Sequence, residues 1–166
     1  MDVIDTPPEE QPPLLDAVGG DADMMVSHVP HARAIGMRLC LARRAYGRVA
    51  VPYQNQLIGN PETGVIHGGV VTTALDSVMG LAVFCALTRM MTIATMDLRI
   101  DYMRPAEPGL ELLAEAYCYK VTRAVAIVRG TAFHSGQEAN PVGASVATFM
   151  LTPDGGGHQP DGGEAS

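Results

Sequence analysis

The sequence predicts an α+β fold in which an antiparallel sheet is wrapped around one long central helix. Residues 64–87 read GVIHGGVVTTALDSVMGLAVFCAL, long enough for a helix of about twenty residues and apolar around most of its circumference. From residue 92 onward the apolar period changes to two, which is typical of consecutive strands. Because so apolar a helix must be covered on most sides, a curled sheet is the expected partner.

Strands are expected both before and after this helix. A hairpin formed by residues 35–42 and 47–53 precedes it, and residues 54–66, with Asn60-Pro61 and Gly64, are expected to be a loop. Four strands with hairpin-length connections follow, at residues 92–103, 110–121, 124–134 and 141–151. In the first of them, strict alternation separates Met96, Leu98, Ile100 and Tyr102 from Thr95, Asp97, Arg99 and Asp101.

Charge and composition divide the 166 residues into one domain and two tails. Residues 1–23 hold seven acids and no base, and residues 152–166 hold three acids and no base. Both tails are rich in Pro, Gly and Asp, which predicts disorder. Although the whole chain carries a net charge of −7, residues 24–151 have eight acids against eleven bases. This mildly basic domain suits a small anionic ligand and carries too little charge for a nucleic-acid surface.

The sequence also predicts the compartment. Cys40, Cys85 and Cys118 are widely spaced within apolar segments, which favours buried free thiols over a metal site or a disulfide framework. His28 and His31 have no partner at metal-ligand spacing, and we interpret them as structural or surface groups. The N-terminus is acidic and Pro-rich, unlike a signal peptide, and polar residues interrupt the apolar run at 64–87. A cytoplasmic protein without a metal or membrane span is expected.

Two glycines at the predicted helix start suggest an oxyanion site. Gly68 and Gly69 lie where backbone N–H groups have no intrahelical partner and the helix dipole is positive. Without side chains in the way, a carbonyl oxygen can approach these N–H groups and be stabilised as it becomes an oxyanion. The alternative is that the glycines only permit a tight turn into the helix.

Asp76 is the second candidate catalytic group. An ionised carboxylate among Ala74, Leu75, Val78 and Met79 costs free energy to bury unless it is paired. Asp76 is therefore expected to have either a bonding partner or a catalytic role. It can take a proton from water or attack a carbonyl directly, and the sequence leaves both routes open. The structural alternative pairs it with an arginine such as Arg99, or makes it the cap of a nearby loop.

The spacing along the helix has a consequence for assembly. Nine residues separate His67 from Asp76, about 14 Å along one helix, whereas a nucleophile and an oxyanion donor must both lie about 3 Å from one carbonyl. One chain cannot supply both groups. Two antiparallel copies can, each giving Asp76 to the helix N-terminus of the other.

Three motifs in order resemble one known family. They are HGG with an Asp nine positions after the His, ATMDLRIDYMRPA, and YKVTRAVAIVRGTAF. Over roughly residues 30 to 151 they resemble the hotdog-fold acyl-CoA thioesterases of the phenylacetate-pathway (PaaI-like) group. The resemblance implies hydrolysis of an acyl-CoA thioester to free acid and coenzyme A, with no cofactor beyond the coenzyme A of the substrate. It also implies a homodimer or a dimer of dimers with shared sites.

The resemblance assigns further roles. It implies that His67 orients the thioester carbonyl, although a loop histidine bonded to backbone is equally open, and that Thr95 positions the attacking water. Asn60 matches a substrate-site asparagine, with a loop one residue longer here. The other residues that it implies for substrate binding are Gly69, Arg104, Lys120 and Arg123.

Two alternatives keep the fold and change the function. One is a hydratase or dehydratase acting on acyl-thioesters, and the other is a non-catalytic acyl-CoA-binding module. The acyl pocket is expected to be shaped by Met79, Val83, Phe84 and a second chain. Aliphatic lining admits many acyl groups, and an aryl or medium-chain acyl-CoA is the expectation.

Overall fold

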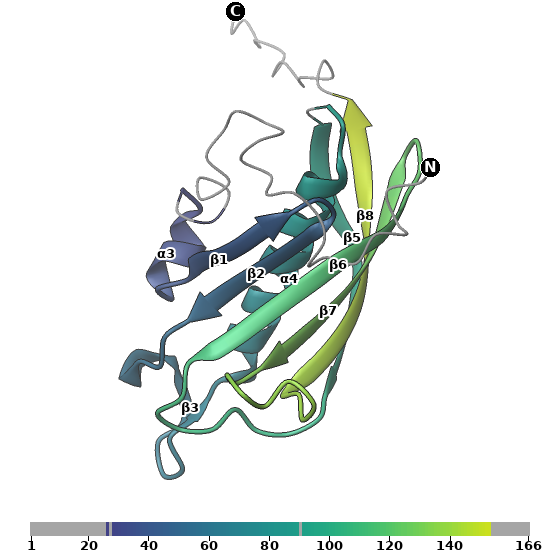
Figure 1. Cartoon of the computed structure of the whole chain (residues 1–166). Coiled ribbons are helices and arrows are strands. Elements are labelled where there is room, and N and C mark those ends of the chain that lie inside the picture. The colour runs from purple at the N-terminus through teal and green to yellow at the C-terminus, as the bar shows by residue number, and fades with distance from the viewer. Residues whose placement is uncertain (1–25, 27, 90, 154–166) are drawn as a thin grey trace, which may run out of the picture.

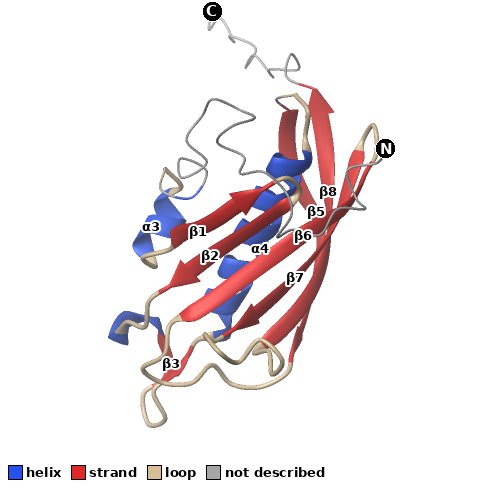
Figure 2. Cartoon of the chain, viewed as in Figure 1, coloured by secondary structure: helices blue, strands red, loops and turns tan. Residues whose placement is uncertain are grey.

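The computed structural model describes residues 26, 28–89 and 91–153, and it places one long helix against a curved antiparallel sheet (Figure 1). The helix is α4 (Gly68–Ala86), and the sheet has six strands in the order β1-β2-β6-β7-β8-β5. Figure 2 shows the strands passing around the helix. The predicted α+β hotdog architecture is confirmed. The predicted tails lie outside the described residues, except for Thr152 and Pro153, which end strand β8.

The strands match the predicted ones, with ends shifted by a few residues. They are β1 (Arg38–Arg43), β2 (Tyr46–Val51), β5 (Met91–Tyr102), β6 (Leu112–Val121), β7 (Val125–Phe133) and β8 (Gly143–Pro153). A short helix, α3 (Pro30–Ala34), precedes them. The stretch expected to be a loop instead holds η2 (Asn55–Leu57), β3 (Ile58–Asn60) and β4 (Val65–Ile66). Strands β3 and β4 pair as a small second sheet beside the start of α4.

Strand β5 contains a β-bulge that strict alternation could not predict. Its pairing with β8 shifts register between Thr95 and Asp97, which leaves Met96 as the extra residue. Thr95 therefore lies on the helix side together with Leu98, while Met96 is 61% exposed. The predicted placements of Thr95 and Met96 were both wrong for this one reason.

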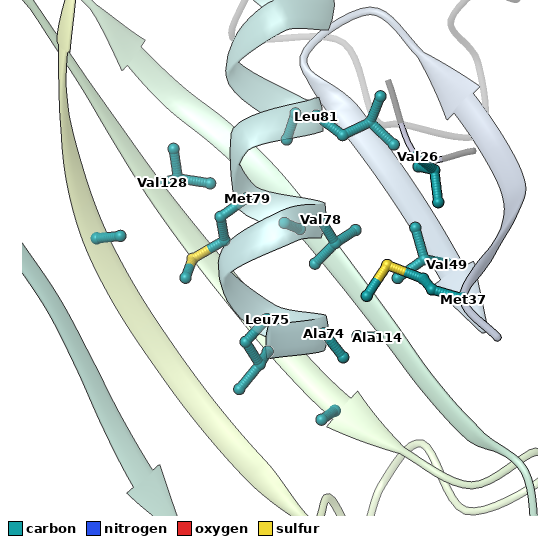
Figure 3. Close-up of a cluster of buried hydrophobic side chains, with 14 of the residues drawn as sticks. Val26, Met37, Val49, Ala74, Leu75, Val78, Met79, Leu81, Ala114 and Val128 are labelled. Carbon is teal, nitrogen blue, oxygen red and sulfur yellow. The ribbon is translucent and has the colours of Figure 1, made fainter. Parts of the chain in front are cut away.

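Aliphatic side chains of the sheet bury most of α4 (Figure 3). Leu75, Val78 and Met79 are fully buried and pack within the same core as Val49 and Val128. The helix is long and apolar enough to cross a membrane, with a mean hydropathy of 1.7, but 61% of that apolar stretch is buried inside the fold. We therefore interpret α4 as the core helix of a folded domain.

The helix lies close to the sheet because glycines face it. A Cβ added at Gly47 would lie 2.7 Å from Leu81 Cδ2, and one added at Gly130 would lie 3.2 Å from Met79 Cγ. Met79 and Val83 are 0% exposed. Their expected role in shaping a substrate pocket was wrong, because they belong to this core; only Phe84 is partly exposed.

The three cysteines lie in different environments. Cys85 and Cys118 are buried free thiols, as predicted, but Cys40 is exposed. Burial raises the pKa of the Cys85 thiol to about 12, with a smaller contribution from Cys118, and burial raises the pKa of the Cys118 thiol to about 11. The folded state therefore keeps two protons that the unfolded chain loses above about pH 8.5.

We predict that a thiol reagent modifies Cys40 in the folded protein, although partial burial raises the pKa of that thiol, and modifies the other two thiols only on unfolding. The native pKa values of Cys85 and Cys118 are both raised, so the two protonated thiols favour the folded state fully below about pH 8.5. This stabilisation is lost as the pH rises from there toward the native pKa values. The free energy of unfolding should fall by roughly 1–2 kcal/mol per thiol between pH 8 and 10. Urea titrations at pH 8 and pH 10 measure the change in the free energy of unfolding. Fast modification of all three thiols in the native protein would contradict the predicted burial of Cys85 and Cys118.

Candidate active site

The start of α4 is held by its own N-cap residue. His67 Nδ1 accepts a hydrogen bond from Gly69 N–H at 2.9 Å, and His67 N–H donates to the Leu57 carbonyl at 2.9 Å. Because Nδ1 is an acceptor, the proton of the neutral ring lies on Nε2. A Cβ at Gly69 would lie 2.9 Å from Nδ1, so glycine is needed here for the cap to form. His67 thus has the backbone bond that the sequence left open, with Nε2–H still available to a ligand.

The cap leaves Gly68 N–H as the available donor of this turn. Gly69 N–H is bonded to the imidazole, and Val70 N–H donates to the His67 carbonyl at 2.9 Å. Among the described residues, no acceptor is hydrogen-bonded to Gly68 N–H. The sequence suggested N–H groups of both glycines as oxyanion donors, whereas the structure shows the Gly69 N–H bonded to His67.

Asp76 has a hydroxyl partner on β5. Thr95 Oγ1 donates to Asp76 Oδ1 at 2.9 Å, and the bulge at Met96 is what brings Thr95 to this side of the strand. Arg99 pairs with Asp101 at 3.1 Å, not with Asp76. Within the described part of the chain, no ion pair to Asp76 is formed. The partly exposed carboxylate can therefore accept a proton or attack an electrophile.

The two halves of this site are separated along one helix. Helix α4 is continuous, and Asp76 lies eight residues beyond Gly68, about 12 Å along the axis. Both groups face the side of the helix next to β5, because Thr72 between them contacts Tyr102 and Asp76 contacts Thr95. A single protomer cannot place both groups on one carbonyl.

Strand β5 is at the end of the sheet and is twelve residues long. Its one described strand neighbour is β8. Unpaired backbone groups along such an edge can pair with a strand of another chain. The edge therefore runs beside Gly68 and Asp76 and is available for a second copy.

Tyr102 at the end of β5 is a residue of the site that sequence reasoning did not identify. Its hydroxyl lies 3.1 Å from the Gly68 carbonyl oxygen and 2.6 Å from Thr72 Oγ1. The sequence contained a signal in the motif Asp-x-x-x-x-Tyr-x-Arg-Pro, but alternation interpreted Tyr102 only as an apolar-face residue. It is 55% exposed.

A mainly apolar hollow of about 400 Å³ opens beside Gly68. Its wall consists of side chains from β4, α4 and the segments around β5 and β8, among them Ile66, Val71, Tyr102, Met103, Ala106 and Val142. Because Gly68 is itself part of the wall, this mainly apolar space lies directly beside the start of α4.

Asn60 and Arg104 are engaged by the chain itself. Asn60 Oδ1 accepts from Glu62 N–H at 3.0 Å, within the turn between β3 and β4. Arg104 lies in the wall of the hollow, but its guanidinium donates to the Asn140 carbonyl at 2.9 Å and to Glu107 at 3.1 Å. Both lie near the helix start, and their polar groups fix loops there.

Lys120 and Arg123 are exposed at the turn between β6 and β7. This turn contacts the end of β8, where Ala124 O accepts from Leu151 N–H at 2.8 Å. The helix start lies at the other end of the sheet, where Tyr102 pairs with Gly143. Within one protomer, these cations are therefore remote from Gly68.

Of the two N-terminal histidines, one contacts the first turns of α4 and the other is exposed. His31 Nε2 contacts Thr73 Oγ1 at 3.2 Å, and His28 is exposed. The described residues contain no group of three His, Cys, Asp or Glu side chains that could hold a metal.

Comparison with known proteins identifies the family of this chain. The thioesterase superfamily model matches residues 63–139, from just before HGG to the loop after β7. The chain is 32% identical over 142 residues to the medium/long-chain acyl-CoA thioesterase YigI of Escherichia coli, covering 78% of this chain and 90% of YigI. The chain belongs to the thioesterase superfamily.

Solved structures agree as well. A Pseudomonas aeruginosa protein matches with a TM-score of 0.72 and 37% identity, over 83% of this chain and 98% of that one. The phenylacetic acid degradation protein PaaI of Thermus thermophilus, in the structure of a mutant form, matches with a TM-score of 0.64 and 22% identity, over 73% of this chain and 97% of that one. At this identity the second match supports the fold alone, which is that of the PaaI-like hotdog thioesterases.

Proposed function

We propose that this protein hydrolyses acyl-CoA thioesters to a free acid and coenzyme A, in two equivalent sites shared by the copies of a homodimer. The observation that carries the proposal is that one unbroken helix holds both Gly68, whose N–H has no acceptor among the described residues, and Asp76, which accepts a hydrogen bond from Thr95 of β5. These are an oxyanion donor and a base or nucleophile, held too far apart to act within one chain.

Antiparallel pairing of two β5 edges would bring the two halves together. The Tyr102 end of one strand would then lie beside the half of the other strand that runs from Met91 and contains Thr95, since the strands run in opposite directions. Gly68 of one copy then faces Asp76 of the second copy, and the two-fold axis generates two such sites.

The chemistry follows from these groups. The thioester carbonyl oxygen accepts from Gly68 N–H, and Asp76 of the second copy takes a proton from a water held by Thr95. The water oxygen forms a bond to the carbonyl carbon, and the oxyanion is stabilised by Gly68 N–H. The C–S bond then breaks and the coenzyme A sulfur receives the proton. Because Thr95 already occupies one carboxylate oxygen, this route is favoured over direct attack by Asp76.

The substrate class is supported by the hollow beside Gly68 and by the medium/long-chain specificity stated in the name of YigI. We favour medium-chain acyl groups over aryl groups, because an apolar tail suits the mainly apolar hollow beside Gly68. Lys120 and Arg123 of the second copy would lie toward the Gly68 end and attract the phosphates of coenzyme A. Arg104 would contribute mainly by holding the wall of the hollow.

The direct test is thiol release from a panel of saturated, enoyl and aryl acyl-CoAs, with Asp76→Asn as the inactive control. We expect free thiol from saturated medium-chain substrates. Loss of enoyl absorbance without thiol release would indicate a hydratase, and binding without turnover would indicate an acyl-CoA-binding module. A screen in which only short-chain substrates react would contradict the proposed acyl preference.

A further inference from the structure

We propose that His134 is a positioning residue for the acyl chain, because it holds the loop that forms one wall of the hollow beside Gly68. The inference rests on the proposed function and adds to it a residue outside the catalytic groups. It arises from a buried histidine that neither the helix cap nor the Asp76–Thr95 pair uses. His134 directly follows strand β7 and is 1% exposed.

Both ring nitrogens of His134 bond to the backbone of residues 103–111, the loop that joins β5 to β6. Nε2 accepts a hydrogen bond from Glu107 N–H at 2.9 Å, and Nδ1 lies 2.8 Å from the Glu111 carbonyl oxygen. Because a carbonyl oxygen can only accept, Nδ1 carries the proton and the ring is neutral. A proton on Nε2 would remove the acceptor that Glu107 uses, so this tautomer is the one that makes both bonds.

These two bonds anchor the second half of the loop. At the start of the loop, the Val142 carbonyl accepts from Met103 N–H at 2.9 Å and from Arg104 N–H at 3.3 Å. Beyond Arg104, and within the part of the chain that the structure describes, the loop backbone bonds to other elements only through His134. The position of residues 105–111 therefore depends on this one side chain more than on any backbone pairing.

The first part of the same loop is a wall of the hollow. The residues that it contributes are Met103, Arg104, Pro105 and Ala106. The N–H that donates to Nε2 belongs to the peptide between Ala106 and Glu107, so this bond directly restrains Ala106, the last residue of the wall. Because Val142 holds the other end of the wall, loss of the Nε2 bond should loosen the wall near Ala106 and leave its start in place.

A fixed wall matters most for the acyl carbons that pack against it. Each methylene that an apolar wall removes from water gains free energy, whereas a wall that moves away leaves the methylene partly hydrated and without contacts. The affinity gained with each added methylene therefore measures how well the wall is held. Loss of the Nε2 bond should weaken long-chain ligands more than short ones.

Asparagine and glutamine separate the two bonds of His134. Asparagine places its amide nitrogen as many bonds from Cβ as Nδ1, so His134→Asn keeps the donor to Glu111 and loses the acceptor for Glu107. Glutamine places its amide oxygen as many bonds from Cβ as Nε2, so His134→Gln keeps that acceptor. Both variants lose the ring and one bond, which makes His134→Gln the matched control for His134→Asn.

The test is the affinity of the full-length protein for S-alkyl-CoA thioethers from methyl to decyl, measured by calorimetry. These ligands lack the thioester carbonyl and cannot be hydrolysed. In the wild type and in His134→Gln, Kd should fall about 2–4-fold with each added methylene. In His134→Asn, the fall should be less than about 1.5-fold for each methylene. Equal dependence on length in the two variants, or no dependence in the wild type, would overturn the proposal.

A measurement on the wild type covers the case in which a variant fails to fold. Saturating S-decyl-CoA should slow hydrogen exchange at the Glu107 amide about 10-fold more than saturating S-methyl-CoA does. Only the longer chain packs against the wall that this amide helps to hold. Equal slowing by the two ligands would overturn the proposal.

The positioning role and the proposed function fail in different ways. Dependence on chain length that is lost in His134→Asn, without thiol release from any acyl-CoA, would refute hydrolysis and support the positioning role. Thiol release from medium-chain substrates, with equal dependence on length in the two variants, would refute the positioning role and support hydrolysis.

Discussion

Asp76→Asn should lower kcat at least ~100-fold, the usual contribution of a positioned base or nucleophile. The amide keeps the shape of the carboxylate, and its oxygen can still accept the hydrogen bond from Thr95. The substitution should therefore remove charge and basicity while leaving the fold and the proposed dimer intact. Steady-state thiol release measures kcat, and circular dichroism and native mass spectrometry on the same sample check the fold and the oligomeric state.

Asp101→Asn provides the comparison for this variant. Asp101 is exposed on the same strand as Thr95 and pairs with Arg99 instead of the helix. It should retain turnover within about twofold, as expected for an exposed ion pair. If the Asp76 variant kept more than a tenth of wild-type kcat, the carboxylate would have only a structural role.

Gly68→Pro should cause a loss of similar size by removing the oxyanion donor, about 10²–10³-fold in kcat. Gly68 is the first residue of α4, the position where proline is favoured because its missing N–H has no helical partner. The preceding residue suits proline too, since His67 has φ −61° and ψ 134°. The variant should therefore fold, with its melting temperature as the check.

Gly68→Ala is the matched control, because it keeps the N–H. Its Cβ would lie 3.5 Å from Tyr102, an ordinary van der Waals contact. We expect the alanine variant to keep most of the activity that the proline variant loses. Equal losses in the two variants would show that the site requires a small residue here and not a donor.

The helix and the succession of strands along the chain were predictable because they depend on repeated physical patterns, whereas the order of the strands within the sheet was not predicted. The apolar run after His67 has to be a buried helix, and the alternation after it has to be strands of a covering sheet. The candidate pair Gly68 and Asp76 was predictable too, since both stand out within that run: two glycines at a helix start and an acid among aliphatic residues.

Three other features depended on tertiary geometry that a local sequence pattern does not contain: the face of Thr95, the partners of Arg104 and the exposure of Cys40. A single bulge at Met96 reversed the face of Thr95, and an alternating pattern cannot show where an extra residue is inserted. Arg104 looks like a free cation in sequence, but loop residues 140 and 107 fold back to engage it. Cys40 lies in an apolar segment, yet that segment is an edge strand and leaves the thiol exposed.

The central claim is that one active site uses Gly68 of one chain and Asp76 of another, and subunit mixing tests it most directly. Asp76→Asn and Gly68→Pro dimers should each be inactive. A heterodimer of the two contains one site with both groups intact and one site with neither. With random exchange, about half of the dimers are heterodimers, so about a quarter of all sites should regain wild-type kcat. Exchange verified by native mass spectrometry without any recovery of thiol release would contradict a shared site.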